Sequence, residues 1–223
     1  MDATQVIEVK KNILADNDAA AEAFRSKLKK EGTFFTDVMA SPGAGKTTLL
    51  LALIERLRAN AEIGIIEADI ESFVDSKKMK SAGVDAVQLE TNGICHTEMG
   101  MVEKAWEAFG GKHYDYLFLE NIGNLVCPAD FDTGAHSRVM LLSVPEGYDK
   151  VYKYPPMFTI VDALIVTKTD YLPMNPDFDR EALKKQARVL NPGLRIFETS
   201  ARTGEGIDEL AEWFKEKHDE TLA

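Results

Sequence analysis

The feature that most constrains the fold is a glycine-rich segment, residues 41–48, placed between a β-rich run and an apolar helical pattern. The run Phe34–Ala40 precedes it, and in residues 46–58 leucine and isoleucine recur at helical spacing. A strand, a glycine-rich turn and a helix in this order are the context of a P-loop, where backbone N–H groups surround phosphate oxygens at the positive end of the helix dipole. The chain therefore predicts a nucleotide-phosphate site in an α/β protein.

Consecutive residues of this segment are predicted to bind the nucleotide, namely Gly43, Ala44, Gly45, Lys46, Thr47 and Thr48. Lys46 is expected to neutralise the charge of the β- and γ-phosphates, and the Thr47 hydroxyl is expected to bind Mg²⁺. The segment departs from the usual motif at one position, because Ala40 stands where the first glycine is expected. An ordinary glycine-rich turn is the alternative, but it leaves the coincidence of strand, loop and apolar helix unexplained.

Strand and helix patterns alternate after this point, which predicts a mostly parallel, twisted sheet flanked by helices, the fold of a P-loop NTPase. Strands are expected at residues 34–40, 62–66, 85–89, 114–119, 138–144, 163–167 and 194–197. Helices are expected at 46–58, 97–109, 178–190 and 206–218, and the proline-containing stretches 154–157 and 172–176 are expected to be loops. An N-terminal helical extension, residues 1–30, precedes a GTPase domain, residues 31–223, and Asp16-Asn17-Asp18 could divide the extension into two helices.

Acidic residues follow two of the predicted strands. Asp69 lies just beyond one strand with Asp75 shortly after it, and Glu120 follows another strand. Because the carboxyl ends of parallel strands face the ligand crevice, we expect these carboxylates to hold Mg²⁺ and to orient water. Asp69 is the candidate for orienting the attacking water, and Asp75 could instead begin a helix. Gly123 is expected to offer its N–H to the γ-phosphate.

Two later segments predict that the base is guanine. Thr167-Lys168-Thr169-Asp170 resembles the Asn-Lys-x-Asp element of GTPases, and Thr in place of Asn is expected to loosen the loop. The Asp170 carboxylate can accept hydrogen bonds from guanine N1 and N2, a donor pair that adenine lacks. Ser200-Ala201 resembles the loop whose backbone N–H groups bind guanine O6. An adenine-nucleotide kinase would need a pocket for a phosphate acceptor, for which the chain gives no sign.

Cys95, His96 and Cys127 form the remaining unusual pattern. They are the only two cysteines of the chain and one of its four histidines, and both cysteines lie in polar, turn-like segments after strands. From the residues alone two interpretations remain open, a Zn²⁺ or Ni²⁺ site or two buried thiols. Three ligands do not complete a closed tetrahedral site, so a metal would sit between two protomers or take a further ligand.

The chain resembles the family of hydrogenase nickel-incorporation GTPases (HypB). The resemblance rests on residues 41–50, 91–96 and 120–128 and on Lys153-Tyr154-Pro155, and it covers nearly the whole chain. It implies a SIMIBI-class GTPase that uses GTP/GDP and Mg²⁺ and helps to deliver Ni²⁺ to the precursor of the [NiFe]-hydrogenase large subunit, together with a HypA-type partner. It also implies a Ni²⁺ or Zn²⁺ site at Cys95, His96 and Cys127, near the interface of a homodimer.

The chain departs from some members of this family because it has no N-terminal cysteine-rich motif and no histidine-rich tract. Nickel handling is therefore expected to depend on the internal site. Because Cys127 closely follows Gly123, GTP binding is expected to alter the metal site. Arg138 and Lys153 are candidates for reaching the nucleotide across a dimer, and either could be an ordinary surface charge. The alternatives are a dimerisation module with structural zinc, a urease-type accessory GTPase and a small-molecule kinase.

Charge and hydropathy exclude some partners. The 26 basic residues against 37 acidic ones argue against non-specific binding of nucleic acid or anionic membranes. No apolar stretch approaches the roughly 20 residues that span a bilayer, and the N-terminus lacks the apolar core of a secretory signal. We therefore expect a cytoplasmic protein, in which a structural disulfide is not expected.

Overall fold

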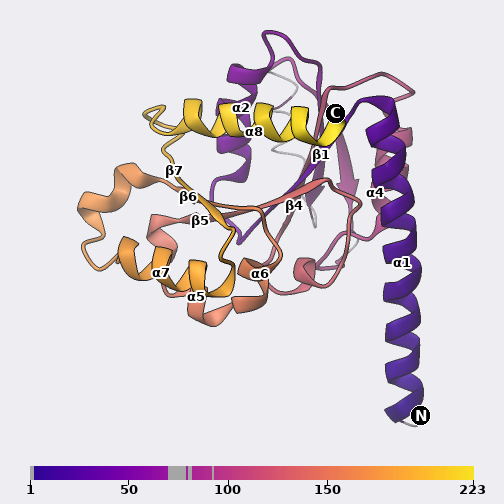
Figure 1. The fold of residues 1–223 in the computed structure, drawn as a ribbon, viewed down its shortest axis with the longest axis horizontal. Coiled ribbons are helices and arrows are strands. Elements are labelled where there is room, and N and C mark those ends of the chain that lie inside the picture. The colour runs from indigo at the N-terminus through magenta and orange to yellow at the C-terminus, as the bar shows by residue number, and fades with distance from the viewer. Residues whose placement is uncertain (1–2, 70–78, 80–81, 92) are drawn as a thin grey trace.

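The computed structural model describes residues 3–69, 79, 82–91 and 93–223, and the side chains of residues 3–13 and of Asp69 fall outside this description. Asp75, a predicted Mg²⁺ ligand, also lies outside the described residues. Within them the chain forms one twisted sheet with helices on both faces (Figure 1). None of the described helices has the length and apolarity that a membrane span requires.

In the described part of the chain the sheet has seven strands, and all of the pairings between them are parallel, which confirms the predicted fold class. The strands lie in the order β3-β2-β4-β1-β5-β6-β7. Their bounds are Phe34–Ala40 (β1), Ile63–Asp69 (β2), Asp85–Glu90 (β3), Tyr116–Gly123 (β4), Ser137–Ser143 (β5), Ala163–Thr167 (β6) and Arg195–Glu198 (β7). Because β1 lies between β4 and β5, the loops that leave β1 and β4 meet at one edge of the sheet, where ligands bind in such folds.

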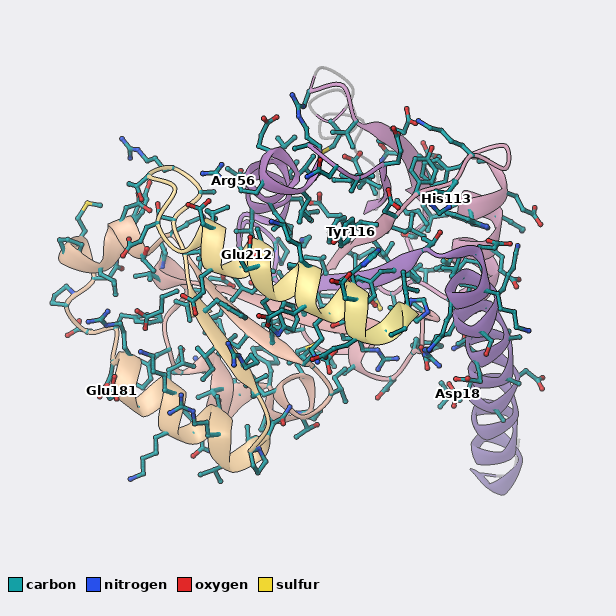
Figure 2. All side chains as sticks on the ribbon, turned by 45° about the horizontal axis from the view of Figure 1, so that its top comes forward. Asp18, Arg56, His113, Tyr116, Glu181 and Glu212 are labelled. Atoms are coloured by element: carbon teal, nitrogen blue, oxygen red, sulfur yellow. The ribbon has the colours of Figure 1, made fainter. Side chains whose placement is uncertain are left out.

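Helices cover both faces because alternate residues of each strand point to opposite sides. The α-helices are α1 (Ala3–Glu31), α2 (Lys46–Leu57), α4 (Met99–Glu107), α5 (Lys150–Lys153), α6 (Pro155–Thr159), α7 (Arg180–Leu190) and α8 (Ile207–Leu222). On β1, Val38 packs in the core cluster that contains α2 and α8, whereas Met39 packs in the cluster that contains α5, α6 and α7. Figure 2 shows Arg56 of α2 close to α8, where its guanidinium lies 3.1 Å from the Asp208 carboxylate.

Several predicted boundaries differ from the structure. The strands β2 and β4 continue to Asp69 and Gly123, so Glu120 lies within a strand and not in a loop. The extension is explained by pairing, because Asp69 is in register with Glu90 and Gly123 with Ala40. The predicted loop at 154–157 contains the start of α6, and the one at 172–176 overlaps a 3-10 helix, Thr169–Met174 (η3). Proline at the first position of α6 is compatible with a helix because no N–H is needed there.

The N-terminal segment is one continuous helix, so a break at Asp16–Asp18 is not present. Asn17, in the middle of that stretch, makes its hydrogen bonds to other parts of the chain. Figure 1 shows α1 along one side of the molecule with its N-terminal end extending beyond the sheet. Its C-terminal half is part of the core, because Phe24 and Leu28 are buried with Phe35 of β1 and Val102 of α4. The division of the chain at residue 30 stays a prediction.

Candidate nucleotide and metal site

The segment between β1 and α2 has the backbone of a phosphate-binding loop. Gly45 has φ +95°, a left-handed conformation that a residue with a side chain seldom adopts, and it immediately precedes Lys46, the first residue of α2. Ala44 is buried, whereas Gly43 is exposed. The first N–H groups of an α-helix have no partner within the helix. The loop can therefore direct those of α2 to phosphate oxygens.

The two predicted Mg²⁺ ligands with described side chains lie in contact. The Thr47 hydroxyl donates a hydrogen bond of 2.7 Å to Glu120 Oε1, and Glu120 is only 7% exposed. Hydroxyl and carboxylate oxygens are ligands that Mg²⁺ prefers. Asp69 is the last residue of β2, and its role stays a prediction.

A further carboxylate, Glu67, was missed by the sequence reasoning. It is buried on β2 in register with Glu120 of β4, so the two residues are neighbours across the sheet. The available signal was its place in the predicted strand-end segment Glu67-Ala68-Asp69, two residues before an acid that was selected. The carboxyl end of the sheet thus gathers more acidic groups than the pattern alone indicated.

The two loops predicted to bind the base are attached to the phosphate loop. Thr167 Oγ1 donates to the Ala44 carbonyl oxygen at 2.7 Å, and Lys168 Nζ donates to the Gly43 carbonyl oxygen at 2.7 Å. Lys168 has φ +59°, and within the described parts of the chain no other non-glycine residue has a positive φ. Thr in place of Asn was expected to loosen this loop, but the threonine hydroxyl holds the loop against the phosphate loop.

The Asp170 carboxylate is positioned beside the second base-binding loop. Ser200 Oγ donates to Asp170 Oδ1 at 2.8 Å, and the Arg202 guanidinium lies 4.0 Å from Asp170 Oδ2. The Asp170 side chain is 16% exposed, so it is accessible from one side. A cavity of about 190 Å³ is lined by residues of all three predicted segments, including Ala44, Thr48, Lys168, Asp170, Ala201 and Arg202. The structure therefore brings together the residues predicted to hold a guanine nucleotide.

A methyl group at position 123 would collide with the phosphate loop, because a Cβ atom on Gly123 would lie 2.9 Å from Pro42 Cγ and from its backbone nitrogen. We expect Gly123→Ala to displace the loop, to weaken nucleotide binding and to lower the free energy of unfolding by about 1–3 kcal/mol. Gly100→Ala on α4 is the matched control, since that site has open space, and it should raise stability by about 0.5–1 kcal/mol. Denaturant unfolding measures both variants, and a Gly123→Ala protein as stable as the parent would contradict this account.

The two cysteines converge, although they are distant in sequence. Cys95 Sγ lies 2.8 Å from Cys127 Sγ and 4.0 Å from His96 Nδ1. Cys127 is the first residue of a short 3-10 helix, Cys127–Ala129 (η1), and the hydrogen bond between the thiols raises the pKa of Cys95. Cys95 is exposed and Cys127 is half-buried, so the pair is accessible and is not a pair of core thiols. Paired thiols are a donor set that suits Zn²⁺ and Ni²⁺.

The third predicted ligand, His96, has other contacts besides the approach of its Nδ1 to Cys95 Sγ. Its ring stacks on Phe131 with a centroid distance of 3.7 Å, and its Nε2 lies 3.1 Å from a Glu98 carboxylate oxygen. Among the described residues no group of three His, Cys, Asp or Glu side chains has a geometry that could hold a metal ion. The structure thus brings the two thiols into contact and His96 Nδ1 to 4.0 Å from one of them. The three predicted ligands lie near one another without forming a complete metal-binding arrangement.

Asn124 connects the phosphate side of the site with the cysteines, and the sequence reasoning did not identify it. Its backbone N–H donates to the Ala40 carbonyl oxygen at 2.9 Å, at the start of the phosphate loop. Its side chain donates to the Cys95 carbonyl oxygen at 3.0 Å and accepts a hydrogen bond from the N–H of Val126 at 2.9 Å. One residue next to Gly123 thus contacts the phosphate-loop strand and the segments of both cysteines.

A buried polar network joins the same parts of the molecule below the surface. Asn121 of β4 donates to the Asp37 carboxylate of β1 at 3.0 Å and accepts a hydrogen bond from the Thr97 hydroxyl at 3.0 Å. Thr133, which follows the Cys127 segment, donates to Asp37 at 2.9 Å. Burial raises the pKa of Asp37, although the hydrogen bond from Asn121 acts in the opposite direction. Removing one partner from such a network is costly, so the cysteine segments are fixed to the central strands.

Arg138 and Lys153, the candidates for contacts across a dimer, have partners within the chain. Arg138 Nη2 lies 2.9 Å from Asp132 Oδ1, and Lys153 pairs with Asp149 one helical turn away. Neither contact involves the nucleotide cavity, and a role for either residue toward the nucleotide stays a prediction.

Comparisons with known proteins agree with this geometry. A family model described as "CobW/HypB/UreG, nucleotide-binding domain" matches residues 35–198. The hydrogenase maturation factor HypB of Azotobacter chroococcum is 41% identical over 212 residues, which are 95% of this chain and 69% of that protein. The crystal structure of HypB from Helicobacter pylori in complex with nickel has a TM-score of 0.87 and 34% identity, covering 93% of this chain and 97% of that one. HypB from Archaeoglobus fulgidus gives a TM-score of 0.85 and 33% identity, covering 92% and 100% of the two chains.

Proposed function

The chain belongs to the CobW/HypB/UreG family and, within it, to the hydrogenase maturation factors HypB, and on this premise we propose that it is a GTP-hydrolysing metallochaperone. Its cargo is Ni²⁺ for the precursor of the [NiFe]-hydrogenase large subunit. The observation that carries the proposal is the position of Asn124, which contacts both the strand entering the phosphate loop and the segments of the two converging cysteines. A nucleotide-dependent movement at Gly123 would therefore reach the metal ligands over a few bonds.

On the nucleotide side, this chain's residues supply positioning and charge. Lys46 neutralises phosphate charge, and Thr47 and Glu120 would hold Mg²⁺. Asp69 orients the attacking water. Asp170 selects guanine by accepting hydrogen bonds from N1 and N2. The products are GDP and inorganic phosphate, which distinguishes this activity from phosphate transfer by a kinase.

On the metal side, Cys95 and Cys127 bind the ion, and His96, whose Nδ1 lies 4.0 Å from Cys95 Sγ, is the third ligand. The short Sγ–Sγ separation and the accessibility of both thiols support this assignment. Three ligands leave a tetrahedral ion incomplete, so two protomers of a homodimer share the metals. The nickel in the Helicobacter pylori HypB crystal structure supports Ni²⁺ as the physiological cargo. A HypA-type protein in the cytoplasm is the proposed partner in this transfer.

The proposed ligands and the need for a dimer can both be tested by measuring metal uptake. Equilibrium dialysis against Ni²⁺ and Zn²⁺, combined with sedimentation of the same samples, should give metal bound only by the dimer. Cys95→Ala and Cys127→Ala should each abolish this uptake while GDP binding is retained. Full-affinity binding by a monomer, or by either cysteine variant, would contradict a shared site of these residues. Tight Zn²⁺ binding that excludes Ni²⁺ would favour a dimerisation module with a structural metal.

A further inference from the structure

Asn17 of α1 contacts the two segments that carry the cysteines. Its Oδ1 accepts a hydrogen bond of 2.9 Å from the N–H of Met99, which closely follows Cys95 and His96 in the chain. Its Nδ2 donates at 2.8 Å to the carbonyl oxygen of Asp132, which closely follows Cys127. A single half-buried side chain from a distant helix thus bridges the two segments.

The hydrogen bond to Met99 supplies a cap that α4 lacks. Met99 is the first residue of α4, and N–H groups at this position have no partner within a helix. The preceding residue, Glu98, makes no capping hydrogen bond, and its carboxylate lies beside the His96 ring instead. Asn is among the residue types that cap helices best, and here it acts from another helix. Asn17 therefore fixes the start of α4 relative to α1.

Independent contacts hold α1 rigidly at this junction. Both nitrogen-to-oxygen contacts between Arg25 Nη2 and the Asp132 carboxylate are short, at 2.7 and 2.8 Å. A Cβ atom on Gly134 would lie 3.1 Å from the Ala21 carbonyl oxygen and 3.1 Å from Met99 Sδ. Residues of α1, of α4 and of the segment after Cys127 thus pack at Gly134 without space for a methyl group. The elements around Asn17 are therefore fixed relative to one another.

We propose that Asn17 is a positioning residue for the metal site, which sets the separation of the Cys95 and Cys127 segments without contacting the metal. The inference rests on the proposed function, in that a metal binds at these cysteines. The two hydrogen bonds of Asn17 restrain both segments in the metal-free protein, so the entropy cost of bringing the thiols together is lowered before the ion arrives. The N-terminal helix α1 thereby raises the affinity of the cysteine site for the metal without contacting the ion.

The test is a Ni²⁺ titration of the full chain, followed by the thiolate-to-nickel charge-transfer absorption. Asn17→Ala should weaken Ni²⁺ binding about 10–100-fold, the range typical of residues that support metal ligands, and should leave GDP affinity within about twofold. Asn17→Asp keeps the acceptor for the Met99 N–H and loses the donor, so it should restore part of the affinity. Asp18→Ala is the matched control, because Asp18 is the exposed neighbour on α1 (Figure 2), and it should bind Ni²⁺ like the parent.

The outcomes separate this inference from the proposed function. Parental Ni²⁺ affinity in Asn17→Ala, with binding lost in Cys127→Ala, would overturn the positioning role and leave the metal site in place. Parental affinity in Cys127→Ala would instead overturn the proposed metal site. A loss of GDP affinity equal to the loss of Ni²⁺ affinity, or no recovery in Asn17→Asp, would assign Asn17 a general structural role and also overturn the inference.

Discussion

Replacing Asp170 by Asn is expected to exchange the preference for GTP for a preference for xanthosine triphosphate. The carboxylate of Asp170 is held by Ser200 at the rim of the base cavity, where it can accept from guanine N1–H and from the 2-amino group. Losing two charge-assisted hydrogen bonds, at about 1.5–3 kcal/mol each, should weaken GTP binding by about 10²–10⁴-fold. Xanthine carries a carbonyl oxygen in place of the 2-amino group, so the Asn side chain can donate to it and still accept from N1–H.

Competition with a fluorescent GDP analogue measures both affinities in the parent, and competition with the matching xanthosine diphosphate analogue measures them in the variant. Asp177→Asn is the matched control, because it makes the same change of charge at an exposed position on the surface, and it should leave both affinities unchanged. The gain of xanthosine nucleotide binding shows that the variant is folded. If Asp170→Asn binds GTP like the parent, the assignment of this carboxylate to the base is wrong.

Replacing Lys46 by Ala is expected to lower the rate of GTP hydrolysis by about 10²–10³-fold, the usual cost of removing one group that stabilises developing charge. Lys46 is the first residue of α2, so its ammonium group is carried by the helix end that the phosphate loop presents. In phosphoryl transfer most of the catalysis comes from such positioned positive charge. Nucleotide affinity should fall less than the rate, because the backbone N–H groups of the loop remain.

Release of inorganic phosphate under single-turnover conditions, with the protein in saturating excess over GTP, measures this effect. Lys185→Ala, an exposed lysine of α7, removes the same charge away from the site and should hydrolyse GTP at the parental rate. A Lys46→Ala variant within threefold of the parental rate would remove the main argument for catalysis at this loop.

The elements with strong local signals could be predicted from the sequence. The phosphate loop follows from glycines and an apolar helix within a short window, and the fold class follows from the alternation of strands and helices. The ends of β2 and β4 could not be predicted, because they extend through pairing with neighbouring strands. Local patterns carry no information on which strands pair with one another. Likewise, the proline-containing segment at Pro155 begins a helix because packing supplies the stabilisation.

The candidate site also combines residues that the sequence could predict with residues that it could not. Its titratable and loop residues belong to recognisable patterns, and most of those with described positions gather at one edge of the sheet. Asn17 and Asn124 make hydrogen bonds between distant segments, and their residue types alone carry no functional signal. The orientation of His96 depends on Phe131, a packing partner that spacing does not reveal.

The central claim is that the nucleotide state controls the metal site, and one titration tests it directly. Ni²⁺ affinity of the parent protein should be measured in the presence of GDP and of a non-hydrolysable GTP analogue, with Cys127→Ala as the control. We predict that the two affinities differ by about 5–150-fold, the usual range of coupling between sites, and that the variant binds no Ni²⁺ in either state. Equal affinities with both nucleotides would contradict the claim and would make the metal a structural component of the fold.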